Sequence, residues 1–229
     1  MVIALILSGG TGSRLGADMP KQYIDVAGKR IIDYCLDTFE ACLAVDAVQI
    51  VAENAWVGVL QTEVWKKIKG FSKPGANRQE SILNGLEDIF TFASEEDVVI
   101  VHDAARPLVT EETLQALLEA TQDHDGAIPM LSMKDTVYFS KDGKTIDSLL
   151  ERKCIYAGQA PESFRLGKYL AANKALSREE LLNINGATEP AVLAGMDVVM
   201  IPGDERNFKI TTKDDLERFR EMMKEHLES

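Results

Sequence analysis

The chain has 229 residues, 45% of them hydrophobic, and its 25 Lys and Arg against 37 Asp and Glu give a net charge of −12. This length fits one large domain with a substantial core. The negative charge excludes a nucleic-acid-binding surface or a surface for anionic membranes, because phosphate groups would be repelled at long range. Any anion site must therefore be local, built from a few cations and backbone N–H groups.

Cysteine content and hydropathy indicate the cellular compartment. Cys35, Cys42 and Cys154 have no metal-like spacing with the three histidines, which favours a reduced protein without a structural metal. The first apolar run, residues 2–7, is too short for a signal peptide, and no stretch approaches the ~20 apolar residues of a membrane span. We therefore expect a cytoplasmic protein with no membrane partner.

Short apolar runs alternate with helical patterns along the chain. Runs without polar alternation are typical of strands buried on both faces of a parallel sheet. We expect strands at 2–7, 47–52, 97–103, 126–131 and 197–203, and helices at 30–43, 54–69, 78–92, 110–123, 165–176 and 213–227. Thr110 and Thr212 are the expected N-caps of the fourth and last helices. The alternation predicts an α/β fold: a single three-layer, Rossmann-like domain over 1–229 with a mostly parallel twisted sheet.

Residues 136–150 break this alternation. They read as two short strands around the turn at 141–144, which is a β-hairpin signal. A protruding hairpin has little core of its own, so one interpretation is a β-hairpin arm over 136–158 that packs on a second subunit and forms a homodimer. The alternative is an antiparallel hairpin at the edge of the same subunit's sheet.

A glycine-rich loop, LSGGTGSRLGADMPKQ at 7–22, follows the first predicted strand. Glycines let backbone N–H groups approach a phosphate closely. Leu15 occupies the third glycine position of a dinucleotide-binding motif, and no Gly-Lys-Ser/Thr closes a Walker loop, so both of those nucleotide sites are disfavoured. Arg14 suits a triphosphate as a bidentate cation and Lys21 as a compact one; the alternative is that both are ordinary solvated loop cations.

Two further segments have a chemical signal of their own. Asp103 ends a buried run, at the carboxyl end of a strand, where it can bind Mg²⁺ or cap a turn against Arg106. Arg106 is equally compatible with a purely structural salt bridge, and His102 is assigned to packing or turn bonding. Arg78 and Ser81 fall on the first turn of a predicted helix after Gly75, where N–H groups and a hydroxyl can bind a ligand.

Together these segments resemble the nucleotidyltransferases that activate a sugar or polyol phosphate. More narrowly, the chain is similar to the cytidylyltransferases that act on 2-C-methyl-D-erythritol 4-phosphate or on ribitol 5-phosphate. The similarity runs through six segments in the same order: GGTGSRLGADMPKQ (9–22), GANRQESILNGL (75–86), VVIVHDAARPLV (98–109), DTV (135–137), ERKCIYAGQAPESF (151–164) and NFKITTKDDL (207–216).

The resemblance implies a role for each matching residue, with CTP and a polyol phosphate as substrates, Mg²⁺ as cofactor and a homodimer as the assembly. The catalytic cations would be Arg14, Lys21 and Lys209. The nucleotide-binding set would be Ser8, Gly9, Gly10, Thr11, Gly12, Gly75, Arg78 and Ser81. The acceptor-binding set would be Asp103, Thr136, Arg152 and Thr188, with Thr136 and Arg152 reaching across a dimer, and Asp103 would also bind the metal.

The expected reaction is in-line attack of the acceptor phosphate on the α-phosphorus of CTP, which gives a CDP-polyol and pyrophosphate. The chain departs from the family near the acceptor, where Glu162 replaces an amide and Pro190 alters the loop at 183–191. Local cues point to both acceptors, so the polyol stays open. The alternatives are a nucleotide-binding regulatory module, a related sugar-phosphate nucleotidyltransferase with another acceptor, and a hydride-transferring Rossmann enzyme.

Overall fold

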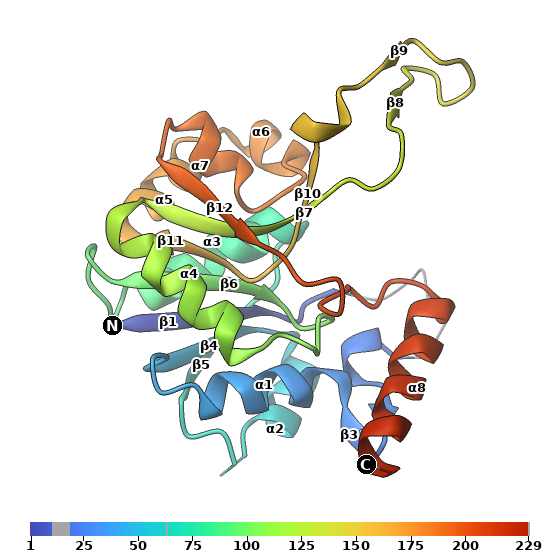
Figure 1. Cartoon of the computed structure of the whole chain (residues 1–229). Coiled ribbons are helices and arrows are strands. Elements are labelled where there is room, and N and C mark those ends of the chain that lie inside the picture. The colour runs from blue at the N-terminus through green and yellow to red at the C-terminus, as the bar shows by residue number, and fades with distance from the viewer. Residues whose placement is uncertain (11–18, 63, 229) are drawn as a thin grey trace.

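A twisted sheet runs through the middle of the molecule, with helices on both faces (Figure 1). The computed structural model describes residues 1–10, 19–62 and 64–228. Eight described strands form this sheet, in the order β10-β7-β11-β6-β1-β4-β5, and β12 also pairs with β7. They are β1 (Val2–Leu7), β4 (Ala47–Val51), β5 (Ile68–Ser72), β6 (Val98–Asp103), β7 (Gly126–Ser132), β10 (Tyr156–Gly158), β11 (Glu162–Arg165) and β12 (Val198–Pro202).

Both faces of the sheet are buried because β1 carries apolar side chains on each side. Ala4 and Ile6 pack in one cluster with α1 (Ile31–Ala41), α2 (Asn54–Leu60) and α4 (Glu111–Asp123). Ile3 and Leu5 pack in another with α3 (Arg78–Ile89), α5 (Leu166–Lys174) and α7 (Glu189–Leu193). These are the three layers expected from uninterrupted apolar strands.

Smaller elements complete the chain. The 3-10 helix η2 (Lys21–Tyr23), β2 (Asp25–Val26) and β3 (Lys29–Arg30) follow the first loop, and α6 (Arg178–Asn183) precedes α7. The last helix, α8 (Lys213–Glu228), packs on β2 and the start of α1 through a separate apolar cluster that contains Val26, Ile31 and Phe219. Among the described residues, no helix is long and apolar enough to cross a membrane.

Strand direction decides which residues lie together at one end of the strands, here the carboxyl end of the parallel strands. β1 pairs in parallel with β4 and with β6, and Leu7 lies opposite both Val51 and Asp103. β11 instead runs antiparallel to β6, with Glu162 opposite Val101, so β11 starts where β6 ends. The carboxyl ends of β1 and β6 and the start of β11 therefore lie together on the same side of the sheet, at the ends of its strands.

The predicted strands and most of the helices are confirmed to within about three residues, and so are both N-caps. Thr110 Oγ1 accepts a hydrogen bond from the Thr113 N–H (3.3 Å), and Thr212 Oγ1 accepts one from the Asp215 N–H (3.2 Å). One helix is wrong: the helix expected over 54–69 ends at Leu60, and residues 68–72 form β5. There the ladder with β4 is the stronger constraint, because it satisfies backbone groups at the sheet edge.

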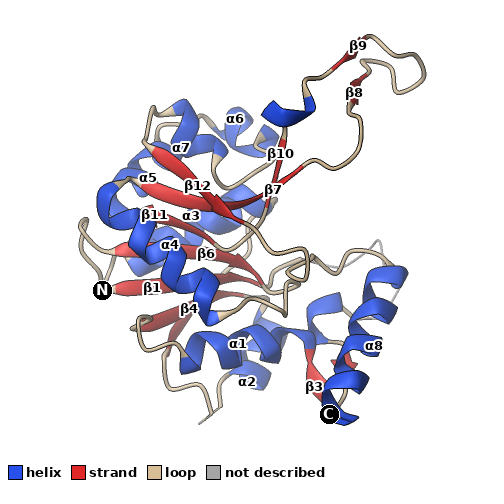
Figure 2. Ribbon diagram, viewed as in Figure 1, coloured by secondary structure: helices blue, strands red, loops and turns tan. Residues whose placement is uncertain are grey.

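The predicted hairpin is present and projects from the body as an arm (Figure 2). It consists of β8 (Tyr138–Phe139) and β9 (Ser148–Leu149), followed by the 3-10 helix η3 (Arg152–Cys154); within the described parts of the chain, β8 and β9 pair only with each other, in a two-stranded sheet. Gly143 takes the positive φ of 67° that the tight turn requires. The alternative of a hairpin on the edge of the main sheet is therefore wrong.

Candidate functional site

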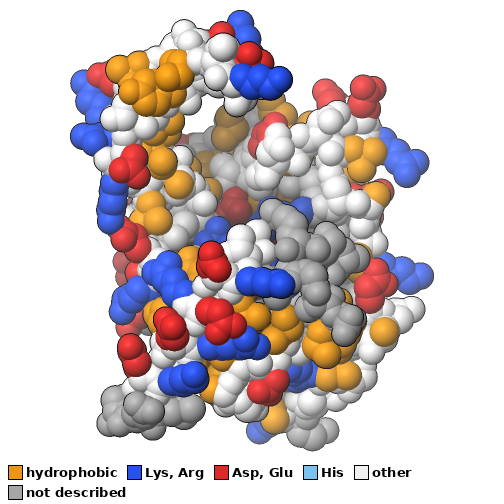
Figure 3. Space-filling model, turned by 90° about the vertical axis from the view of Figure 1, so that its right-hand side faces the viewer, with side chains coloured by type: hydrophobic (Ala, Val, Ile, Leu, Met, Phe, Trp, Pro, Cys, Tyr) orange, Lys and Arg blue, Asp and Glu red, His pale blue; other side chains and the backbone are white. Residues whose placement is uncertain are grey.

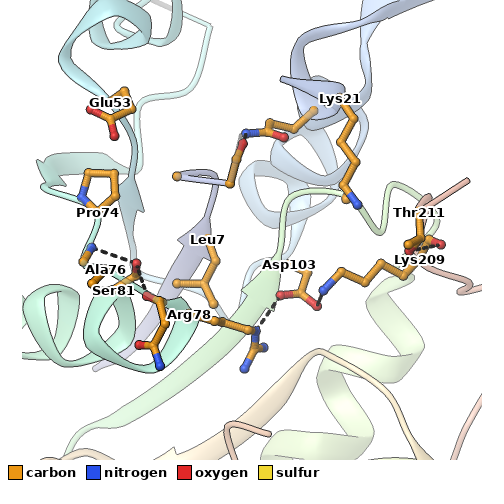
Figure 4. Close-up of a pocket in the computed structure, with 16 residues that line it drawn as sticks. Leu7, Lys21, Glu53, Pro74, Ala76, Arg78, Ser81, Asp103, Lys209 and Thr211 are labelled. Carbon is orange, nitrogen blue, oxygen red and sulfur yellow. Dashed lines mark hydrogen bonds and ion pairs between the residues drawn. The ribbon is translucent and has the colours of Figure 1, made fainter. Parts of the chain in front are cut away.

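A cavity of about 500 Å³ opens at the edge where β1 and β6 end. Asp103 lies within it, and the side chains of Arg78 and Lys209 reach Asp103 from two other segments (Figure 4). The described lining comes from the loop after β1, η2, the loop into α3, the end of β6 and the segment before α8. It comprises Leu7, Gly9, Gly10, Lys21, Gln22, Glu53, Pro74, Gly75, Ala76, Asn77, Arg78, Ser81, Asp103, Ala105, Lys209 and Thr211.

Side chains of η2 hold the loop after β1 in place through hydrogen bonds. Buried Gln22 donates from Nε2 to the Ser8 carbonyl (2.5 Å) and to the Gly10 carbonyl (2.9 Å). The Ser8 hydroxyl donates to the Tyr23 phenol oxygen (2.7 Å) inside the protein. Ser8 and Gln22 thus fix the start of the loop, and the sequence pattern missed Gln22 although it stands beside Lys21. Of the predicted loop residues, Thr11, Gly12 and Arg14 lie outside the described residues.

The loop into α3 forms the opposite wall of the cavity. The Gly75 N–H donates to the Ser81 hydroxyl oxygen (2.9 Å), and that hydroxyl donates to the Asn77 carbonyl (2.8 Å). Asn77 caps α3 by accepting from the Glu80 N–H (2.8 Å). A Cβ at Gly75 would lie 2.5 Å from the Glu80 Cβ, so only glycine fits there. Gly75 and Ser81 are placed at the cavity as predicted, and Ser81 also shapes its wall.

Asp103 is the carboxylate on which the cations converge. Its Oδ1 accepts from Arg78 Nε (3.0 Å), its Oδ2 accepts from Lys209 Nζ (2.9 Å), and Arg106 Nε lies 3.8 Å from Oδ2. Burial raises the pKa of Asp103, but the charges of Arg78 and Lys209 outweigh burial and hold that pKa well below its usual range. Asp103 therefore stays ionised throughout the physiological range.

Arg106 and His102 form the turn after β6. Arg106 donates from Nη1 to the Asn207 carbonyl (2.7 Å), and its own carbonyl lies 3.0 Å from His102 Nε2. Burial lowers the pKa of His102 to about 4, so the ring is neutral near pH 7. The turn bonding expected for His102 is present, and Arg106, for which a structural role was one of two alternatives, connects the turn through the Asn207 carbonyl to the segment that carries Lys209.

Lys21 and Lys209 reach the cavity from different sides. Lys21 extends from η2, and Lys209 extends from the segment that follows β12 (Figure 4). The Lys209 ammonium is bonded to Asp103. These two residues are 188 positions apart in the chain, and the fold brings both to one cavity on a protein of net charge −12. The local concentration of positive charge expected from the sequence is therefore present.

Glu162 and Thr188 lie behind Arg78. The Thr188 hydroxyl donates to Glu162 Oε2 (2.5 Å), and Glu162 Oε1 lies 3.7 Å from Arg78 Nη2. Glu162 is buried, and burial raises its pKa against the opposing effects of Arg78 and Thr188. The sequence marked Glu162 only as a departure from the family pattern. It did not predict the contact between Glu162 and Arg78.

Three of the four predicted acceptor residues do not line this cavity within one chain: Thr188, which lies behind Arg78, and Thr136 and Arg152. Thr136 and Arg152 are exposed at the base of the arm, and Arg152 donates from Nη1 to the Lys134 carbonyl (2.7 Å). Neither residue lines the cavity among the described residues.

The residues present fit a metal that is held largely by a bound ligand. No group of three or more His, Cys, Asp or Glu side chains in the described parts of the chain forms a complete metal cage. Mg²⁺ typically takes one or two carboxylates and completes its shell with substrate phosphates and water. Asp103 supplies one such carboxylate, and its two oxygens have lone pairs beyond those used by Arg78 and Lys209.

A three-layer α/β fold, a glycine-containing loop after its first strand and a cavity lined by two lysines, one of them paired with a carboxylate at the end of a parallel strand, are the features of a nucleotidyltransferase. The family model described as 2-C-methyl-D-erythritol 4-phosphate cytidylyltransferase matches residues 2–225, and the chain belongs to this family. It is thus a cytidylyltransferase, which transfers CMP from CTP to a polyol phosphate, and enzymes of this family depend on a metal ion.

Relatives with two different acceptors are about equally similar. The 2-C-methyl-D-erythritol 4-phosphate cytidylyltransferase of Geobacter metallireducens is 34% identical over 99% of both chains. The ribitol-5-phosphate cytidylyltransferase of Streptococcus agalactiae is 32% identical over 96% of this chain and 94% of its own. The crystal structure of the Francisella tularensis 2-C-methyl-D-erythritol 4-phosphate cytidylyltransferase superposes with a TM-score of 0.81 at 27% identity, over 95% of this chain and 97% of the other.

Proposed function

We propose that the cavity around Asp103 is the active site, where CTP and a polyol phosphate bind side by side. The observation that carries the proposal is that Arg78 and Lys209 both pair with Asp103 at the carboxyl end of the parallel strands, in a cavity that Lys21 also lines. Open α/β sheets bind their ligands at this end of the strands. CTP lies between the loop after β1 and the loop into α3, with Gly9, Gly10, Gly75, Arg78 and Ser81 around it.

The reaction is an in-line displacement at the α-phosphorus of CTP. An oxygen of the acceptor phosphate forms the new bond to phosphorus, and the bond from phosphorus to the oxygen bridging towards the β-phosphate breaks, which releases pyrophosphate. The acceptor phosphate is already an anion near neutral pH, since its second pKa is about 6. No general base is required, and the protein's task is to align two anions and offset their charge.

Lys21 and Lys209, with Arg14 in the loop after β1, supply that positive charge. An ammonium group that faces the departing pyrophosphate stabilises charge as it develops in the transition state. Asp103 fixes Lys209 through its hydrogen bond of 2.9 Å and stays ionised beside it. Asp103 also contributes to holding Mg²⁺, which when bound to the triphosphate neutralises part of its charge.

The acceptor binds beyond Asp103, towards Thr188, and its phosphate is held by Thr136 and Arg152 of a second subunit. The arm supports this arrangement because it projects from the body and carries exposed apolar side chains, seen at the top of Figure 3. They are Tyr138, Phe139, Ile146 and Leu149, which are 45–68% exposed. A homodimer would bury them and bring each arm to its partner's cavity. We place this reaction in the cytoplasm.

A pyrophosphate-release assay tests the proposal directly. The purified protein is incubated with Mg²⁺ and CTP, and 2-C-methyl-D-erythritol 4-phosphate or ribitol 5-phosphate is added in separate reactions. We expect pyrophosphate only when CTP, Mg²⁺ and one of these acceptors are present together. ATP, GTP and UTP in place of CTP serve as controls for the base. Binding of CTP without pyrophosphate release with any polyol phosphate would favour the regulatory module instead.

A further inference from the structure

Glu162 is a buried carboxylate placed directly behind the proposed active site. It is 6% exposed, and it is not among the described residues that line the cavity. It begins β11, whose antiparallel pairing with β6 sets Glu162 next to the end of the strand that carries Asp103. A charged group at this depth requires partners, because burial without them is costly.

The partners of Glu162 form a chain of polar contacts that ends at the reaction centre. On one side Glu162 Oε2 accepts from the Thr188 hydroxyl (2.5 Å). On the other side Glu162 Oε1 lies 3.7 Å from Arg78 Nη2, and Arg78 Nε donates to Asp103 (3.0 Å). Glu162 thus contacts one proposed acceptor residue directly and a second one, Asp103, through Arg78.

The charge on Glu162 acts mainly on Arg78 and more weakly on Arg106. An amide at this position could still accept the Thr188 hydrogen bond, but it would leave Asp103 as the only carboxylate that holds Arg78. The other groups that face Glu162 are Asp103, Arg106 and the Tyr169 phenol of α5. Two carboxylates on either side of one guanidinium restrict its position more than a single carboxylate does.

The segment before α7 is anchored from α3 and α5 as well. The Tyr169 hydroxyl donates to the Ala187 carbonyl (2.7 Å), and Asn77 Nδ2 donates to the Leu181 carbonyl (2.9 Å). Thr188 is the residue of this segment that points to Glu162, and it is the N-cap of α7 without a cap hydrogen bond from its own side chain. Its hydroxyl therefore donates a hydrogen bond to Glu162 and does not cap the helix α7.

We propose that Glu162 is a positioning residue for the acceptor: its carboxylate holds Arg78 against Asp103 and fixes the Thr188 hydroxyl, and so sets the geometry of the acceptor end of the cavity. This inference rests on the proposed function, since it assigns the acceptor to that end. CTP depends on Glu162 only through Arg78, because the backbones of the loops at 8–10 and 75–81 are held by hydrogen bonds that do not involve Glu162.

The test is Glu162→Gln, which keeps the shape and an oxygen for Thr188 but removes the charge. Steady-state kinetics with the acceptor that is active in the pyrophosphate assay should show KM for the acceptor raised about tenfold, with KM for CTP changed less than about twofold. Ser163→Ala is the matched control. Ser163 is the next residue of β11, fully buried and bonded to Thr121 on α4 (2.6 Å), so this change removes a buried hydrogen bond on the other face of the sheet.

A second variant keeps the test decisive if Glu162→Gln folds poorly. Thr188→Val breaks the same contact from its other end and should raise KM for the acceptor similarly. In the double variant the two effects should not add, because both act through one contact. Unchanged acceptor KM in both single variants would overturn the proposal, and so would an equal rise in KM for CTP. The same loss in Ser163→Ala would reduce Glu162 to a structural role. Absence of any wild-type activity would instead overturn the proposed function.

Discussion

Asp103 shows how one residue can organise the cavity that we propose as the binding site for two anionic substrates. The carboxylate is negative, yet it lies among Arg78, Arg106 and Lys209 and holds two of them at hydrogen-bonding distance. Its own charge is offset, and the ammonium and guanidinium groups are kept in fixed positions. Preorganised charges of this kind need no rearrangement when charge develops in a transition state.

Lys21 is the residue whose loss should affect catalysis most selectively. Lys21→Ala is expected to lower kcat by at least about 100-fold, because one preorganised cation at the departing pyrophosphate is removed. The melting temperature should change little, since Lys21 lies on the short helix η2 at the cavity wall. Lys174→Ala, which removes an exposed lysine paired with Glu87 on the molecule's surface, is the control and should retain full turnover. Near-normal kcat in the Lys21 variant would contradict its assignment.

Asp103→Asn is expected to destabilise the fold by roughly 3 kcal/mol at pH 7, at the lower end for a broken buried pair because Arg78 and Lys209 keep some contact with water. The folded-state pKa of Asp103 is lowered, so its stabilisation is fully present above about pH 5 and is lost as pH falls below the unfolded value of about 3.9.

Urea unfolding from pH 8 to pH 3 checks this dependence. The difference in unfolding free energy between wild type and variant should be constant down to about pH 5 and then shrink. His102 also titrates in the acidic range, and because the charge of Asp103 raises the pKa of His102, its contribution differs between the two proteins and has the opposite sign. A difference that grows towards low pH would mean that the sign of the pKa shift is wrong.

At the scale of elements, β11 determines where Glu162 sits. β11 fills the gap between β6 and β7, and it runs antiparallel to both. It can lie this close to β7 because Gly126 has no side chain: a Cβ there would be 2.6 Å from the Ser163 carbonyl oxygen and 2.7 Å from the Phe164 ring. Backbone and a buried ring cannot yield cheaply.

Gly126→Ala should therefore destabilise the protein by about 1–3 kcal/mol, as overpacking in a core does. Chemical denaturation measures the effect. Gly58→Ala is the opposite control, because Gly58 lies within α2 with nothing near its Cβ position, and alanine there should stabilise by up to about 1 kcal/mol. Equal effects of the two changes would show that β11 and β7 are not packed as closely as described.

At the scale of the whole molecule, the arm explains why one chain does not present all the expected acceptor residues at one cavity. Thr136 and Arg152 lie at the base of the arm, while Lys21 and Asp103 lie in the body. A site shared between subunits makes a prediction that a site within one subunit does not. If one inactive variant is changed in the body and another in the arm, a dimer that contains one copy of each should regain activity.

We expect Lys21→Ala and Arg152→Ala to be nearly inactive alone and to complement each other when co-expressed. In a mixed dimer one site carries both changes and the other carries neither, so random pairing should restore about a quarter of wild-type activity. Pyrophosphate release by the co-purified mixture measures it, and two Lys21→Ala copies bearing different tags provide the control. An inactive mixture that contains verified mixed dimers would place Arg152 and Lys21 in the same subunit's site.

The strand and helix pattern could be predicted from the sequence because it is local. The buried strands are mostly apolar and lack regular polar alternation, and Thr110 and Thr212 mark two helix starts with side chains that accept backbone hydrogen bonds. The helix expected over 54–69 failed because a short segment with ambiguous periodicity took the conformation that its neighbour β4 required. β10 and β11 were not predicted either, because they are also short segments with ambiguous periodicity.

By itself the sequence determined the chemistry: ordered motifs placed the glycine-rich loop, Lys21, Asp103 and Lys209 in one class of enzyme. Only the tertiary structure decided which charges meet. Arg78 bridges Asp103 and Glu162, and Thr188 is bound to Glu162 and not to its own helix. Residue types and local periodicity are properties of neighbours along the chain, whereas an ion pair between α3, β6 and β11 depends on strand order and direction, which no local pattern encodes.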